Sequence, residues 1–212
     1  MNPHATRFFI AIFIASALSG CISIMPPQRD KRPSFMVACS RTSSEVSSTD
    51  STTALTVRVR RFKTADPYAS RRIVLQNASS GQIQLLKDGD FAVMPGVLAS
   101  DTLRRWLADS KAFASVVDTS VVSSGDNITL DGWVEKLYVK EEDSGEKFLV
   151  LSMTIWVQSS DTEATGKNSN FIRETSVPLD STEPAKIADA FGKALATVYT
   201  EFESWLLTSL GK

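Results

Sequence analysis

The thiol of Cys21 is the reactive group whose surroundings in the sequence most clearly define a reaction. Cys21 closes the tetrapeptide Leu18-Ser19-Gly20-Cys21, in which a small residue precedes the cysteine and a branched apolar residue stands two places earlier. This is the pattern that lipoprotein signal peptidase cuts. We therefore expect cleavage between Gly20 and Cys21, after which Cys21 is the first mature residue and carries fatty acyl groups such as palmitate.

The residues before Cys21 have the composition of a secretion signal. Arg7 and the free amine form a weakly basic start, and the run from Phe8 to Ala17 is apolar. That run is about ten residues long, whereas a helix needs about 20 apolar residues to span a bilayer. The alternative is an uncleaved anchor helix, which the short run and the Ser-Gly-Cys ending both disfavour. The start of the chain resembles a bacterial lipoprotein precursor, with a signal peptide at residues 1–20.

The rest of the chain is expected to be a lipidated tether at residues 21–33 and one periplasmic domain at residues 34–212. Pro26, Pro27 and mixed charges are typical of a tether. In enterobacteria an aspartate directly after the lipidated cysteine favours the inner membrane, so Ile22 favours the outer membrane. We therefore expect attachment to the periplasmic face of the outer membrane.

Several common catalytic motifs are missing from the mature chain. The one histidine, His4, lies in the segment expected to be removed, which excludes Ser-His-Asp and Cys-His mechanisms and imidazole zinc sites. Glycine-rich phosphate loops and CxxC pairs are absent. Asp131 and Glu135 could form a carboxylate pair, but no second motif accompanies them. We expect no enzymatic activity, no metal and no cofactor.

The remaining cysteine lacks a disulfide partner, and the charge balance argues against a nucleic-acid partner. If Cys21 carries lipid, Cys39 has no partner for an intramolecular disulfide, and we expect it to be a small buried apolar side chain. The chain has 23 basic and 24 acidic residues, a formal net charge of -1. A nucleic-acid partner would favour a strongly basic face, so we expect none.

Hydrophobic periodicity predicts an α+β domain: a mostly antiparallel sheet with two amphipathic helices packed on one face. A change of parity near Glu135 and Lys136 predicts a β-bulge in one long strand. The proline at position 95 predicts the start of the first helix, and Pro184 that of the second. The predicted strands span residues 34–40, 55–62, 71–76, 82–86, 128–139, 148–158 and 171–177, and a further short strand lies within 113–122. The predicted helices span 96–110 and about 20 residues after 184.

The strand at 148–158 has one face that is expected to bind a partner. Leu149, Leu151, Met153, Ile155 and Val157 share one parity and predict the core face. Phe148, Val150 and Trp156 lie on the other face, which a half-buried sheet would expose to water. Exposed apolar side chains often mark contacts, so these three are the candidate partner-binding residues. The alternative is that a loop covers them.

Four basic residues follow each other closely near the strand at 55–62. Arg58, Arg60, Arg61 and Lys63 are either a solvated strand face or a surface for an acidic partner or lipid headgroups.

Over most of the mature chain, the order of features resembles the ABC-type transport auxiliary lipoproteins, the family of the paraquat-inducible operon's lipoprotein. The sequence departs from the family pattern at Phe91, where tryptophan is usual, and at Ala69, where leucine is usual. The matching stretches are Phe35-Met36-Val37, Leu55 to Val59, Pro67-Tyr68 to Val74, Phe91 to Pro95, the positions Leu103, Leu107, Phe113 and Val116, and the C-terminal helix.

The resemblance implies a non-catalytic accessory of a lipid-transporting ABC system. Such a lipoprotein would work beside an MCE-domain protein, which bridges the periplasm, and would dock the far end of that bridge to the outer membrane. The alternative is a structural or assembly lipoprotein of the cell envelope or of a secretion complex.

Overall fold

The computed structural model of the chain describes residues 32–41, 53–119, 128–159 and 169–211, and the part from Arg32 onward forms one compact unit. The signal peptide, Gly20, Cys21 and the tether up to residue 31 lie outside the described residues. Most of the serine- and threonine-rich stretch at 41–53 also lies outside them.

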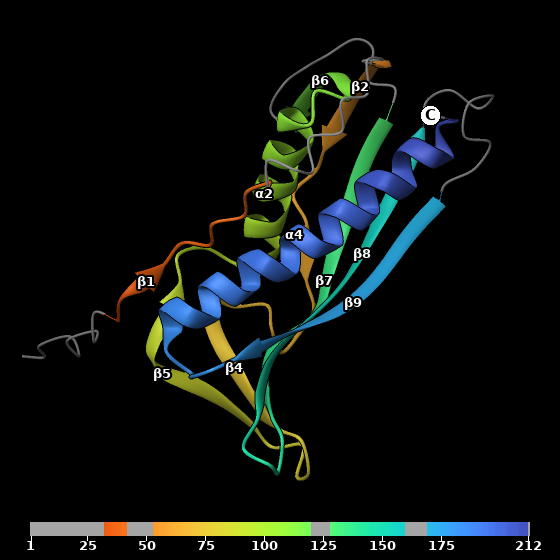
Figure 1. Cartoon of the computed structure of the whole chain (residues 1–212). Coiled ribbons are helices and arrows are strands. Elements are labelled where there is room, and N and C mark those ends of the chain that lie inside the picture. The colour runs from red at the N-terminus through yellow and green to blue at the C-terminus, as the bar shows by residue number, and fades with distance from the viewer. Residues whose placement is uncertain (1–31, 42–52, 120–127, 160–168, 212) are drawn as a thin grey trace, which may run out of the picture. The chain divides into compact units, whose positions relative to one another are not determined.

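The described strands form one mixed sheet of nine strands, and two helices lie on one of its faces (Figure 1), which confirms the α+β fold class. The strands are β1 (Ser34–Phe35), β2 (Thr53–Val59), β3 (Lys63–Thr64), β4 (Arg72–Asn77), β5 (Ile83–Phe91), β6 (Phe113–Asp118), β7 (Ile128–Glu141), β8 (Lys147–Ser159) and β9 (Ser169–Leu179). The helices are α2 (Pro95–Asp109) and α4 (Pro184–Ser209).

Strand β7 is the centre of the sheet. On one side it pairs antiparallel with β8, which pairs antiparallel with β9, as the long alternating segments predict. On the other side it takes three short parallel neighbours, β2, β3 and β4. The register shifts between Val134 and Lys136, which confirms the predicted bulge. The bulge switches the parity of β7, so that Val134 and Leu137 both face the core.

Both helices begin at the prolines that the sequence indicates, and each buries the predicted stripe. In α2, Leu103, Trp106 and Leu107 are at most 2% exposed. In α4, the buried residues recur at helical spacing along its length, and the five on the core face of β8 are buried as well. The hydrophobic core therefore lies between the helices and the inner face of the sheet. Among the described residues, no helix is both long and apolar enough to cross a bilayer.

The segment after β1 crosses α4 in very close contact. A Cβ atom at Gly192 would lie 2.0 Å from the carbonyl oxygen of Ala38, so only glycine allows this approach. Three residues further on, Arg41 reaches Glu203 on the same helix. The first described segment is thereby held against the helical layer.

A buried tyrosine joins the two helices and should make the fold sensitive to alkaline pH. The Tyr199 hydroxyl donates to the carbonyl of Ala99 at 2.7 Å and lies 2.9 Å from Thr102 Oγ1. Burial raises the pKa of Tyr199 well above its usual value. The unfolded chain would lose this proton near about pH 10, while the folded chain keeps it. The contribution of Tyr199 to the free energy of unfolding is therefore complete below that pH and falls as the pH rises above it.

We therefore expect Tyr199→Phe to cost about 1 kcal/mol at neutral pH and to make the alkaline loss of stability shallower. Urea unfolding at about pH 8 and about pH 11 would measure both effects. An unchanged alkaline slope in the variant would contradict the assignment to this side chain.

Candidate docking surface

The outer face of the sheet, which points away from α2 and α4, carries an exposed apolar patch. Trp133 on β7 is 40% exposed and Ile172 on β9 is 63% exposed. Thr154 of β8 lies between them in register, which puts all three side chains on one face. Trp156, two residues along β8, shares that face and is half-buried. We call Trp133, Trp156 and Ile172 the outer-face patch.

The neighbours of these residues identify the face independently of the register. Val134 and Ile155, next to Trp133 and Trp156, are fully buried on the helix side. Phe171, next to Ile172, packs its ring against Phe202 of α4 at a centroid separation of 5.5 Å. Because successive side chains of a strand alternate between faces, the outer-face patch must point away from the helices.

Ion pairs border the outer-face patch on two sides. Lys136 Nζ donates a hydrogen bond of 2.9 Å to a carboxylate oxygen of Glu174, and this hydrogen bond raises the pKa of Lys136. On the other side, Arg60 lies 4.0 Å from Asp131. An apolar centre with a polar rim is the usual composition of a protein interface.

The three predicted partner-binding residues differ in exposure. Phe148 and Trp156 are half-buried, whereas Val150 is only 4% exposed and offers a partner almost no surface. The cross-strand neighbour of Val150 is Tyr138, and Tyr68 stacks on Tyr138 at a centroid separation of 5.9 Å. A loop therefore covers the face next to Val150, while the end that carries Trp156 stays open.

Sequence reasoning missed the two most exposed members of the patch. Trp133 has the opposite parity to Leu130 and Val134, and Ile172 the opposite parity to Phe171. The sequence therefore indicates the face on which each side chain lies. It does not indicate that β7, β8 and β9 pair so that these side chains lie next to each other.

Strand β9 also offers a free edge beside the patch. Of the described strands, β9 pairs with β8 alone, so its other side has backbone groups that no described strand satisfies. An extended segment of a partner could add to such an edge and place its side chains on the outer-face patch.

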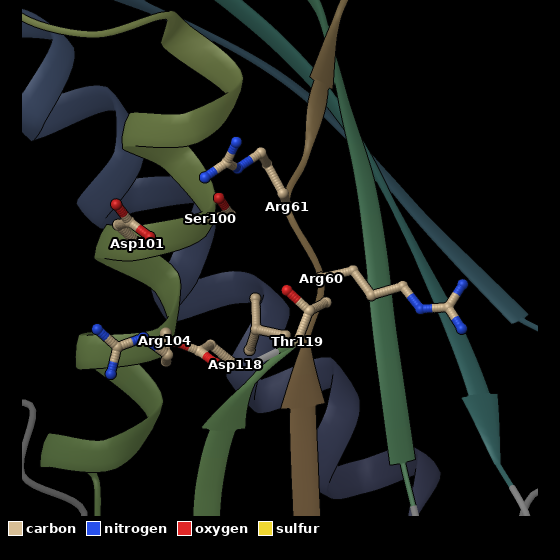
Figure 2. Close-up of a pocket in the computed structure, with 8 residues that line it drawn as sticks. Arg60, Arg61, Ser100, Asp101, Arg104, Asp118 and Thr119 are labelled. Carbon is tan, nitrogen blue, oxygen red and sulfur yellow. The ribbon is translucent and has the colours of Figure 1, made fainter. Parts of the chain in front are cut away.

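The basic cluster near β2 is divided between the two faces of the sheet. Lys63 lies beside Trp133 in register and Arg60 pairs with Asp131, so both belong to the outer face. Arg58 donates to the carbonyl of Asp118 at 3.1 Å. Figure 2 shows Arg61 directed instead towards Ser100 on α2, on the helix side.

A small groove lies between β2, β6 and α2, and Arg61 lines it (Figure 2). Its volume is about 160 Å³, and the charged side chains that face it are Arg61, Arg104, Asp101 and Asp118, whereas the Arg60 side chain points away (Figure 2). The mixed charge gives this groove no clear preference for an anion. The lining residues are Val59, Arg60, Arg61, Ser100, Asp101, Arg104, Asp118 and Thr119.

The most buried charged group of the described residues has a structural role. Glu203 accepts hydrogen bonds from Arg41 at 2.6 Å and from Trp106 Nε1 at 2.8 Å. The Arg41 guanidinium also lies over the Trp106 ring, 4.8 Å from its centroid.

The described residues contain no group of three or more histidine, cysteine or acidic side chains that could hold a metal ion.

Comparisons with known proteins support the fold alone. No protein-family model matches the sequence, and no curated protein matches it. The structure is similar to a protein from Xanthomonas campestris of the family DUF330, with a TM-score of 0.67 and 17% identity over 82% of this chain and 95% of that one. A second, uncharacterised protein matches with a TM-score of 0.63 and 12% identity, over 82% of this chain and 98% of that one.

A hypothetical protein from Chlamydia trachomatis is similar at a TM-score of 0.50 and 10% identity, over 74% of this chain and 98% of that chain. At such low sequence identities, the similarity shows only that the proteins share a fold. The architecture of the described residues is thus the one found in the DUF330 protein, with almost the whole length of that protein covered.

Proposed function

We propose that this chain is a non-catalytic envelope lipoprotein that acts as the auxiliary component of an ABC-type, MCE-associated lipid transport system. Cys21 carries the lipid anchor, and the domain docks an MCE-domain protein at the periplasmic face of the outer membrane. The lipobox, the order of family-like motifs and the similarity in fold to a DUF330 protein all support this role. The auxiliary lipoprotein family is related to DUF330.

The outer-face patch is the observation that carries the docking role. Two tryptophans and an isoleucine lie together on a sheet face that neither described helix covers. The rim of this patch carries charges of both signs, with Arg60 and Lys63 beside Asp131 and Glu174, so the fitting partner presents an apolar centre with a mixed polar rim. A partner strand added to β9 would bring such side chains into reach.

The test is affinity capture of the tagged, full-length lipoprotein from detergent-solubilised membranes of the bacterium of origin. We expect the MCE-domain protein to be captured, and Ile172→Asp or Trp156→Asp to reduce its recovery by about tenfold or more, because a charge would then face an apolar interface. Far-ultraviolet circular dichroism and the thermal midpoint would show that each variant stays folded.

Ile83→Asp is the matched control. Ile83 is 45% exposed on β5, outside the outer-face patch, so this substitution adds the same charge to another exposed strand position. Recovery of the MCE-domain protein should not change. Capture of secretion-pore subunits without an MCE-domain protein would replace this proposal with a role in envelope assembly.

A further inference from the structure

A second apolar patch lies next to the point where the described chain begins. Met36, Val93 and Met94 are 66%, 38% and 52% exposed. Ala92 N donates to the carbonyl of Phe35 at 2.9 Å, which places the segment 35–36 directly beside the segment 92–94. We call Met36, Val93 and Met94 the β1 patch. Figure 1 shows β1 beside the connection that leads from β5 to α2.

Two arginines, Arg32 and Arg71, lie near the β1 patch. Arg71 is exposed, and its carbonyl accepts from Phe91 N at 2.8 Å, one residue before Ala92. Arg32 precedes β1 by two residues. The acidic residue that pairs in register with β1 is Asp90, which is buried and forms ion pairs with Arg72 at 3.2 Å and Arg32 at 3.7 Å.

The tether places this end of the domain close to the bilayer. Eleven peptide links separate Cys21 from Arg32, so the chain between them spans about 40 Å at most. If Cys21 is lipidated, Arg32, four residues before Met36, lies within that distance of the membrane surface, and even a weak contact of the β1 patch then forms because it is intramolecular.

We infer that the β1 patch is a membrane-contacting surface that rests on a bilayer with anionic phosphate headgroups. This inference depends on the lipid anchor of the proposed function. The methionines are unbranched, flexible and apolar, and so they adapt to the boundary between headgroups and acyl chains. Arg32 and Arg71 lie where they can approach the phosphates of neighbouring lipids. The lipid anchor and the β1 patch together give the domain two points of attachment.

The test uses the full mature chain with an N-terminal histidine tag in place of the acyl groups, bound to vesicles that contain a nickel-chelating lipid and phosphatidylglycerol. Because this artificial anchor does not depend on acylation of Cys21, the test stays informative even if the proposed function is wrong. We expect the double variant Met36→Asp, Met94→Asp to weaken apparent binding by about tenfold or more, since only the tag then holds the domain.

The matched control is the double variant Ile83→Asp, Leu85→Asp, at two β5 positions that are 45% and 46% exposed. It should bind these vesicles like the unchanged chain. Equal binding of the Met36, Met94 variant and the unchanged chain would overturn the inference. If that variant instead lowers the molar mass in solution and leaves vesicle binding unchanged, the β1 patch joins copies of this chain, and the inference is equally overturned.

Discussion

Replacing Glu203 by alanine should lower the free energy of unfolding by about 3–5 kcal/mol, because it breaks a buried ion pair. The side chains of Arg41 and Glu203 are only 9% and 8% exposed, and their charged atoms are 2.6 Å apart. The substitution would also remove the acceptor of Trp106 Nε1. Since this ion pair holds the segment after β1 against α4, its loss should also loosen that segment.

Urea unfolding followed by circular dichroism would measure the loss, and hydrogen exchange would report the loosening near residues 36–41. Glu201→Ala is the matched control on the same helix. Glu201 pairs with Arg173 at 2.7 Å, but both side chains are more than a third exposed, so we expect a cost below about 1 kcal/mol. Equal costs at the two positions would show that burial of the Glu203 pair does not matter for stability.

Replacing Cys21 by alanine should leave the protein unacylated and mislocalised. The lipobox predicts that the thiol of Cys21 receives the acyl groups, and signal cleavage depends on that modification. Several acyl chains, each contributing about 0.8 kcal/mol per buried CH₂ group, hold a protein firmly, whereas the β1 patch alone would bind weakly. The expected product is an unacylated precursor that keeps residues 1–20.

Fractionation and mass spectrometry of the purified chain would test this expectation. Cys39→Ala serves as the control, because it removes the other thiol and should leave both acylation and membrane association unchanged. Normal acylation and fractionation of the Cys21→Ala variant would contradict the lipobox assignment, and so would a mature chain that begins at a residue other than Cys21.

The elements of the fold were predictable wherever their signal is local. The alternation in β8, the helical spacing in α4 and the parity change in β7 depend on residues close together in the chain, and all three were confirmed. The starts of α2 and α4 were predictable as well, because proline suits the first turn of a helix.

The pairing of the short strands was not predictable. Strands β2, β3 and β4 all lie parallel to β7, although β4 and β7 are about 50 residues apart. Alternation tells which face a side chain occupies and does not tell which strand lies beside it. Strand β3 has only two residues, so it carries no periodicity at all.

The sequence by itself determined the candidate lipid-attachment residue and the two faces of the long strands. A peptidase reads a short linear motif, and the alternation of a strand is a property of consecutive residues, so neither needs distant contacts. Only the tertiary structure decided which outer-face residues stay accessible. Val150 is buried beside a tyrosine stack, while Trp133 and Ile172 are exposed, because exposure depends on what neighbouring strands and loops place over a side chain.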